Sequence, residues 1–128
     1  QEDIFEKHSG DGGRGMNRRE TGSRYEKFAA GQLEKRGYEV LAFNYRCRQG
    51  EVDLICRQGG VLVFVEVKYR ATDRFGAPSQ AVDARKQERI RKAAVHYMCS
   101  RGIAPDVPCR FDVVSILGGQ VEIIENAF

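Results

Sequence analysis

The sequence lacks an apolar run approaching the ~18 to 20 residues that a helix needs to cross a bilayer. It also lacks a secretory signal, because residues 1–20 are polar and contain no apolar stretch after a basic start. We therefore expect a cytoplasmic protein with no membrane partner. A Ser/His/Asp arrangement, a phosphate-cradling loop and a nucleotide-binding fingerprint are missing as well.

A cysteine pattern for structural zinc is also absent. The four cysteines are Cys47, Cys56, Cys99 and Cys109. None of them forms a CxxC pair, and only His8 and His96 could supplement them as ligands. In a cytoplasmic setting we predict reduced, partly buried thiols and no disulfide.

The bulk composition is that of one globular domain. The chain has 128 residues, of which 41% are hydrophobic and 30% charged, which suits one domain and argues against general disorder. The net charge of +3 permits a nucleic-acid partner without arguing for one. We predict a disordered tail over residues 1–21, which are rich in glycine and charge, and a single domain over residues 22–128.

Hydrophobic periodicity predicts the order helix, three strands, helix, then one or two strands. The expected helices are Ser23 to Arg36 and Ser79 to Ser100, and the expected strands are Tyr38 to Arg46, Glu51 to Gln58, Val61 to Arg70, Cys109 to Leu117 and Val121 to Ile124. The first three strands can form an antiparallel meander, and the strand after the second helix can dock beside them through a crossover. Helices packed on this sheet give a mixed-sheet α/β sandwich.

The strand from Val61 to Arg70 carries the first sign of chemistry. Side chains alternate between the two faces of a strand, so the valines at 61, 63, 65 and 67 share one face, which we expect to be the core. Glu66 and Lys68 lie side by side on the other face. The peptide carbonyl of Val67 lies between them.

The hairpin register predicts what lies opposite these two side chains. Gly59-Gly60 is a good two-residue turn, and a hairpin closed there places Asp53 directly opposite Glu66. The same register places Glu51 opposite Lys68. The two facing carboxylates then have Cβ atoms about 4.5 to 5.5 Å apart.

Two opposed carboxylates are unfavourable unless something lies between them, and a divalent cation is the simplest answer. Hard oxygen ligands from Asp53, Glu66 and the Val67 carbonyl suit Mg²⁺ or Mn²⁺. Lys68 would then orient a water molecule or stabilise developing charge. The alternative is a solvated strand face on which Glu51 and Lys68 form an ordinary cross-strand pair, and the pattern alone leaves both interpretations open.

Two motifs carry a resemblance to a known family. Gly50 to Ile55, followed by Val63 to Arg70, resembles the YraN-type family of bacterial proteins, which is grouped with the PD-(D/E)XK nucleases and the archaeal Holliday-junction resolvases. The resemblance runs from about residue 22 to the end of the chain. It continues through Phe75-Gly76, Ala81-Val82, Lys86 with Arg89, Arg110 to Val114, and Asn126-Ala127-Phe128.

The resemblance implies a restriction-endonuclease-like fold with the order αβββαβ(β). It also implies that Asp53 and Glu66 are metal ligands and that Lys68 is the catalytic lysine. Glu26 matches an acid of the first helix that completes the site in related nucleases; its alternative is a capping box with Ser23. The motif's proline is replaced by Val52, which removes no ligand.

The second helix is the expected nucleic-acid surface. Lys86 falls between Val82 and Ile90 on the apolar stripe, so its ammonium either snorkels into solvent or reaches toward the site. The basic first half of this helix is either a solvated face or a track for phosphates. We expect nucleic acid to contact Arg70, Arg85, Lys86 and Arg89. No aromatic stacking platform is evident, so we expect recognition of the backbone or of its shape.

These features predict a Mg²⁺-dependent endonuclease that hydrolyses DNA phosphodiesters, with branched DNA among its candidate substrates. Junction cleavage would suggest a homodimer. The alternative function is a non-catalytic nucleic-acid-binding or adaptor domain that keeps the nuclease fold.

Overall fold

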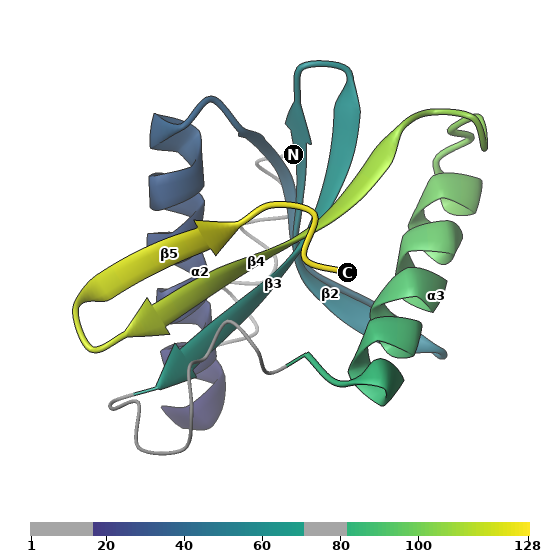
Figure 1. Ribbon diagram of the computed structural model, residues 1–128. Helices are drawn as coiled ribbons and strands as arrows, with labels where there is room; N and C mark the ends of the chain where they lie inside the picture. Colours follow the sequence, from purple (N-terminus) through teal and green to yellow (C-terminus); the bar gives the residue numbers. More distant parts are fainter. Residues whose placement is uncertain (1–16, 71–81) are drawn as a thin grey trace.

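The computed structural model in Figure 1 describes residues 17–70 and 82–128. Its elements are α2 (Asn17–Lys35), β1 (Glu39–Cys47), β2 (Gly50–Gln58), β3 (Val61–Arg70), α3 (Ala84–Ser100), β4 (Cys109–Leu117) and β5 (Gln120–Ile124). This is the predicted order, and the α/β fold class is confirmed. Phe75-Gly76, Ala81 and the predicted tail up to residue 16 lie outside the described residues.

The five strands form one mixed sheet in the order β1-β2-β3-β4-β5. β3 and β4 are parallel, and the three other neighbouring pairs are antiparallel. A parallel pair needs a crossover connection, and α3 lies on that connection, as predicted. β3 is therefore the central strand of the sheet.

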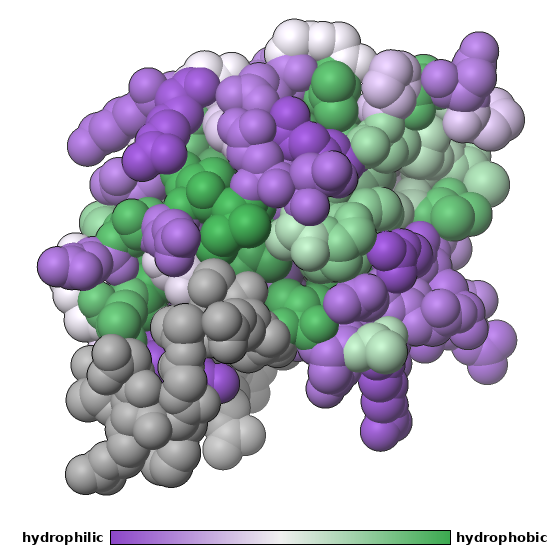
Figure 2. All heavy atoms as spheres, viewed as in Figure 1, coloured by the Kyte–Doolittle hydropathy of each residue, from purple (hydrophilic) through white to green (hydrophobic). Residues whose placement is uncertain are grey.

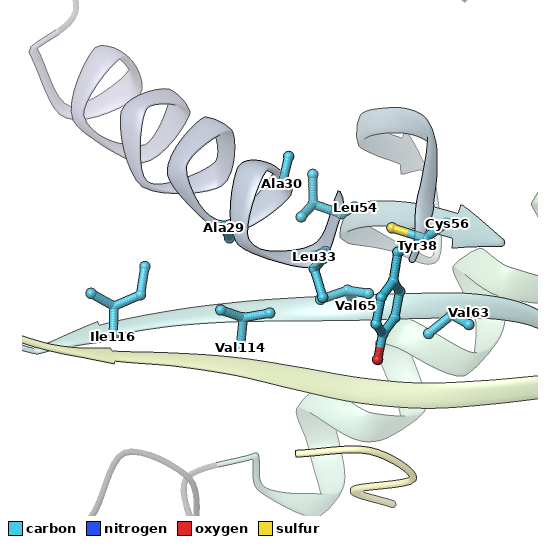
Figure 3. Packing of buried hydrophobic residues seen from close by; sticks show 10 residues of the cluster. All are labelled: Ala29, Ala30, Leu33, Tyr38, Leu54, Cys56, Val63, Val65, Val114 and Ile116. Atoms are coloured by element: carbon cyan, nitrogen blue, oxygen red, sulfur yellow. The ribbon is translucent and has the colours of Figure 1, made fainter. Parts of the chain in front are cut away.

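Hydrophobic side chains cover both faces of β3. On one face, α2 packs Ala29 and Leu33 against Val65 and its neighbours (Figure 3). On the other face, α3 packs Ile90 and other apolar residues against Phe64. The prediction of a single core face was therefore too narrow, because a central strand covered by a helix on each side is buried on both faces.

Both helices begin at residues other than those predicted. α2 begins at Asn17, so Ser23 lies inside the helix and cannot be the N-cap of a capping box. Arg18, Arg19 and Glu20 are good helix formers, which explains the longer helix. α3 begins at Ala84, because the Asp83 side chain caps it by accepting a hydrogen bond from the Lys86 N–H at 2.8 Å.

Gly50, at the start of β2, fixes the contact between this strand and α3. It is buried, and a Cβ atom there would overlap with the backbone carbonyl oxygen of Arg89. Only glycine allows the two backbones to approach so closely. The first residue of the Gly50 to Ile55 motif therefore positions the helix that carries the basic residues.

A buried polar network closes the C-terminus onto the sheet. Asp112 is fully buried and accepts two hydrogen bonds from Arg110 and one from Tyr38, all between 2.8 and 2.9 Å. It also accepts the Asn126 N–H at 2.9 Å. The ring of Phe128 then stacks on that of Phe111, with centroids 5.2 Å apart. These motif residues therefore have a structural role.

Two expectations about the whole chain can be compared with the structure. All four cysteines are free thiols; Cys56 is buried and Cys47 half-buried, whereas Cys99 and Cys109 are exposed. The thiols are free, as predicted, but only Cys47 and Cys56 have the predicted partial or full burial. Neither α2 nor α3, the helices of the described ranges, is long and apolar enough to cross a membrane.

Candidate functional site

β2 separates from β3 at Asp53. The pairing of the two strands runs from Gln58 opposite Val61 to Leu54 opposite Val65, in the predicted register. The pairing of β2 with β1 continues further, to Gly50. Beyond Leu54, β2 therefore follows β1 away from β3. We call this divergence the strand fork. Asp53 lies on one side of it, and Glu66 and Val67 lie on the other. The predicted Glu51–Lys68 pair lies beyond the fork and is not part of the ladder.

Asp53 takes the place of a backbone acceptor at the fork. Its Oδ2 atom accepts the Val67 N–H at 2.8 Å. In a continued ladder this N–H would bond to the carbonyl of Val52, because hydrogen-bonded pairs recur at every second residue. The N–H and C=O of one residue leave a strand on the same edge, so we infer that the Val67 carbonyl also faces the fork.

The carboxylate of Glu66 is close enough to Asp53 to affect its pKa. Burial raises the pKa of Asp53 well above its ordinary value, and the charge of Glu66 raises it further, although the Val67 N–H opposes the shift. Glu66 is buried, with only 5% of its surface exposed. The fork therefore holds two acids that resist being charged together.

Two lysines stand on the Glu66 side of the fork. The Nζ of Lys86 lies 3.2 Å from Oε2 of Glu66, so Lys86 reaches the site rather than solvent alone. Burial by itself would lower the pKa of Lys86, but attraction to Glu66 gives a net rise. Burial lowers the pKa of half-buried Lys68, and the charges of Lys86 and Arg70 add to this effect, while Glu66 opposes it.

Glu26 reaches the edge of the fork from α2. It is buried, and its Oε1 accepts a hydrogen bond from the Asn44 side-chain amide at 3.0 Å. Burial raises its pKa to about 7, with a further contribution from Glu51, against the opposing charge of Arg46. The start of α2 at Asn17 excludes the capping box with Ser23, and the role of Glu26 in a metal site stays a prediction.

Asn44 is a site residue that the sequence analysis missed. Its neighbours Phe43 and Tyr45 pair with Leu54 and Val52, which places Asn44 beside Asp53 across the β1–β2 ladder. Asn44 has a φ of 52°, in the left-handed region that asparagine tolerates better than most residues. An asparagine inside a strand pattern was the available signal, since asparagine is depleted in strands.

The donor set at the fork fits a cation with hard oxygen ligands. No group of three or more His, Cys, Asp or Glu side chains converges on one point in residues 17–70 and 82–128. Glu26 is near enough for Glu66 to contribute to its pKa shift. Two carboxylates and a carbonyl still match Mg²⁺, which often takes one or two carboxylates and keeps several water molecules.

Of the basic residues in the first half of α3, Arg91 and Lys92 make contacts within the domain, whereas Arg85 and Arg89 are exposed. Figure 2 shows hydrophilic residues over its first half, at the lower right of the view, and Arg85 and Arg89 are exposed there. The Arg91 guanidinium instead packs over the ring of Phe128, 5.2 Å from its centroid. Lys92 forms an ion pair with Glu88 at 3.6 Å.

An aromatic pair that the sequence did not make evident joins α2 to the end of β3. The rings of Tyr25 on α2 and Tyr69 on β3 stack with centroids 4.0 Å apart and an interplanar angle of 18°. The two tyrosines lie far apart in the sequence, so no local pattern could reveal the pair. Each directly adjoins a predicted site residue, Glu26 or Lys68.

Comparison with known proteins agrees with the motifs. Residues 25–116 match the Uncharacterised protein family UPF0102. A UPF0102 protein of Lachnoclostridium phytofermentans is 45% identical over 113 residues, which cover 88% of this chain and 96% of that protein. UPF0102 proteins of Saccharophagus degradans and Yersinia pseudotuberculosis are 46% and 44% identical, over 85% and 88% of this chain and 92% and 97% of their own lengths. The chain therefore belongs to the UPF0102 family, the YraN-type family that its motifs resemble.

Proposed function

We propose that this protein is a divalent-metal-dependent endonuclease that hydrolyses DNA phosphodiesters. The observation that carries the proposal is the buried pair of Asp53 and Glu66, in which burial and the charge of Glu66 raise the pKa of Asp53 well above its ordinary value. Mg²⁺ or Mn²⁺ held by these carboxylates and the Val67 carbonyl would relieve that repulsion. A bound ion of this kind acidifies a water molecule and polarises a phosphodiester.

The chain's own residues supply the remaining functions of a hydrolase. Lys68 adjoins Val67, and its lowered pKa lets it exchange a proton more readily than an exposed lysine does. It can orient the attacking water or stabilise charge on the phosphate. Lys86, which neutralises Glu66 in the absence of metal, is free to turn toward a phosphate once a cation takes over that task.

The DNA backbone would follow the first half of α3. Arg85 and Arg89 are exposed there, and Arg70 ends β3 directly after the site. Cationic side chains of this kind position a duplex through its phosphates without reading its sequence. Branched DNA is the substrate class that we favour within this proposal, and symmetric cleavage of a junction would require two copies of the site, hence a homodimer.

A second candidate function follows from the Lys86–Glu66 ion pair. At 3.2 Å this pair neutralises one acid of the fork without any metal. In a domain that only binds nucleic acid or another protein, the Lys86–Glu66 ion pair would persist and no metal would replace it. Such a protein would bind DNA in EDTA with a strong dependence on salt, and it would cleave no substrate.

Cleavage of labelled single-stranded, duplex and four-way-junction DNA in Mg²⁺ and in Mn²⁺ tests the proposal. We expect Asp53→Asn and Glu66→Gln each to reduce the rate by at least about a hundredfold. Removal of the metal by EDTA should abolish cleavage, and Lys68→Met should reduce it strongly. Glu122→Gln, which changes an exposed acid on β5, is the matched control. Cleavage that survives both fork substitutions would refute the assignment.

A further inference from the structure

Two aromatic side chains of the described residues are exposed, Tyr69 near the end of β3 and Phe28 on α2. Tyr69 is 41% exposed although its ring stacks on Tyr25. Phe28, three residues after Tyr25 on the same helix, is 44% exposed. Besides these two, Val95 is the exposed large hydrophobic residue of the described ranges, and it lies on α3. We call the stacked pair of Tyr25 and Tyr69 the aromatic platform.

The platform adjoins the strand fork. Tyr69 directly follows Lys68, so its Cα lies about 3.8 Å from that of the proposed catalytic lysine. Tyr25 directly precedes Glu26 on α2. Figure 1 shows the arrowhead of β3 ending beside the N-terminal half of this helix. Side chains alternate along β3, so the ring of Tyr69 lies on the α2 face of the sheet, the side from which Glu26 reaches the edge of the fork, and on the opposite face from Lys68.

Packing within the domain explains only part of the platform. Tyr25 contacts the core cluster beneath α2 and fills space there. Its contact holds the ring of Tyr69 in one orientation, yet a large part of Tyr69 stays in solvent. Exposed aromatic rings that are fixed in place are typical of binding surfaces, because little conformational freedom is lost when a ligand stacks on them.

The charge around the platform identifies the kind of ligand. Arg24 is exposed, and it is near enough to Tyr25 to influence its pKa. Arg70 follows Tyr69 in the chain. A nucleotide combines a flat base with a phosphate, which matches an exposed ring with the guanidinium of Arg24 near it. A base paired inside a duplex cannot stack on a protein ring, so the nucleotide must be unpaired.

We propose that the aromatic platform binds an unpaired nucleobase of the DNA whose backbone crosses the strand fork, with Tyr69 as the stacking residue. The inference rests on the proposed function and deepens it, because it identifies the substrate as DNA with unpaired nucleotides beside the reacting phosphate. Flaps, gaps, frayed ends and junction centres have this property, whereas an intact duplex does not. Stacking on one ring raises affinity by roughly five- to a hundredfold per base.

Binding in EDTA tests this inference separately from catalysis. The full chain is titrated into a fluorescein-labelled single strand of about 15 nucleotides, a length near the upper site size of single-strand-binding folds, and into a blunt duplex of the same length. We expect Tyr69→Ala to weaken single-strand binding about tenfold and to leave duplex binding unchanged. Tyr69→Phe should bind as the wild type does. Val95→Ala, which truncates an exposed apolar residue on α3, is the matched control.

Further measurements keep the result decisive. Tyr69→Leu preserves apolar volume without an aromatic ring, so it should show the same loss as Tyr69→Ala even if the alanine variant folds poorly. Equal losses for single strand and duplex, or no loss at all, would overturn the inference. So would a dimer in the wild type that Tyr69→Ala converts to a monomer, because the platform would then be a contact between copies. A failure to cleave DNA leaves these binding curves unaffected and bears on the proposed function alone.

Discussion

The buried carboxyl of Glu26 should make the stability of the metal-free protein fall as pH rises. Its pKa is about 7 in the folded protein, against an ordinary value of 4.5. Because the folded state binds this proton more tightly than the unfolded state does, protonation favours folding. Stability from this group is therefore fully present below about pH 4.5 and is lost as the pH rises toward 7. Glu26→Gln has no ionisable group and should not show this loss.

The size of the effect follows from the two pKa values. Each pH unit between them changes the unfolding free energy by about 1.4 kcal/mol. The interval from 4.5 to about 7 therefore gives an upper limit of about 3 kcal/mol. Residual access of solvent to the carboxyl reduces this to about 2 kcal/mol. The glutamine oxygen can still accept the hydrogen bond from Asn44, so little else changes.

Urea unfolding in EDTA at several pH values measures the difference between the wild type and Glu26→Gln. The variants should be nearly equal at pH 4.5, and Glu26→Gln should be more stable by about 2 kcal/mol at pH 8, which is a midpoint increase of about 1 to 2 M urea. Glu122→Gln, in an exposed position on β5, serves as the control. A difference that stays constant from pH 4.5 to 8, or a glutamine variant that is less stable at pH 8, would refute the reasoning.

Two further predictions concern the scaffold around the site, and urea unfolding measures both. Gly50→Ala should destabilise the fold by about 1 to 3 kcal/mol, because the new Cβ overlaps with backbone atoms of Arg89; Gly119→Ala, which has open space around it, should have little effect. Arg110→Ala should lower stability by about 3 to 5 kcal/mol, because it leaves the fully buried Asp112 without its charged partner. Arg57→Ala breaks an exposed ion pair with Glu39 and should change stability by less than about 1 kcal/mol. Equal losses for Gly50→Ala and Gly119→Ala, or for Arg110→Ala and Arg57→Ala, would refute these structural explanations.

Local features of the sequence predicted the hairpin well. The ranges of β3 and β4 are those expected from alternating apolar residues and turn residues. The register that pairs Leu54 with Val65 follows from the two-residue turn, because a short loop fixes which residues face each other. Asp53 and Glu66 could therefore be placed near each other before any coordinates were known.

The features that the sequence did not reveal depend on contacts between distant segments. The stacking of Tyr25 on Tyr69 and the hydrogen bond from Asn44 to Glu26 join α2 to separate strands. The end of the β2–β3 pairing at Leu54 also has no local signal in the sequence. Hydrophobic periodicity predicts one helix or strand at a time, so it cannot predict contacts between side chains of separate elements.

Asp112 and Asp53 are two buried acids of the same domain with different surroundings. Asp112 is surrounded by donors from a guanidinium, a hydroxyl and a backbone N–H, as expected where burial serves stability. Asp53 accepts the Val67 N–H, but its other neighbour at the fork is a second acid, Glu66, which raises its pKa further. Asp112 is thus neutralised by a guanidinium, whereas Asp53 is buried beside another carboxylate. Departures from local rules that gather in one place, here with the left-handed Asn44, are typical of positions that selection holds for binding or chemistry.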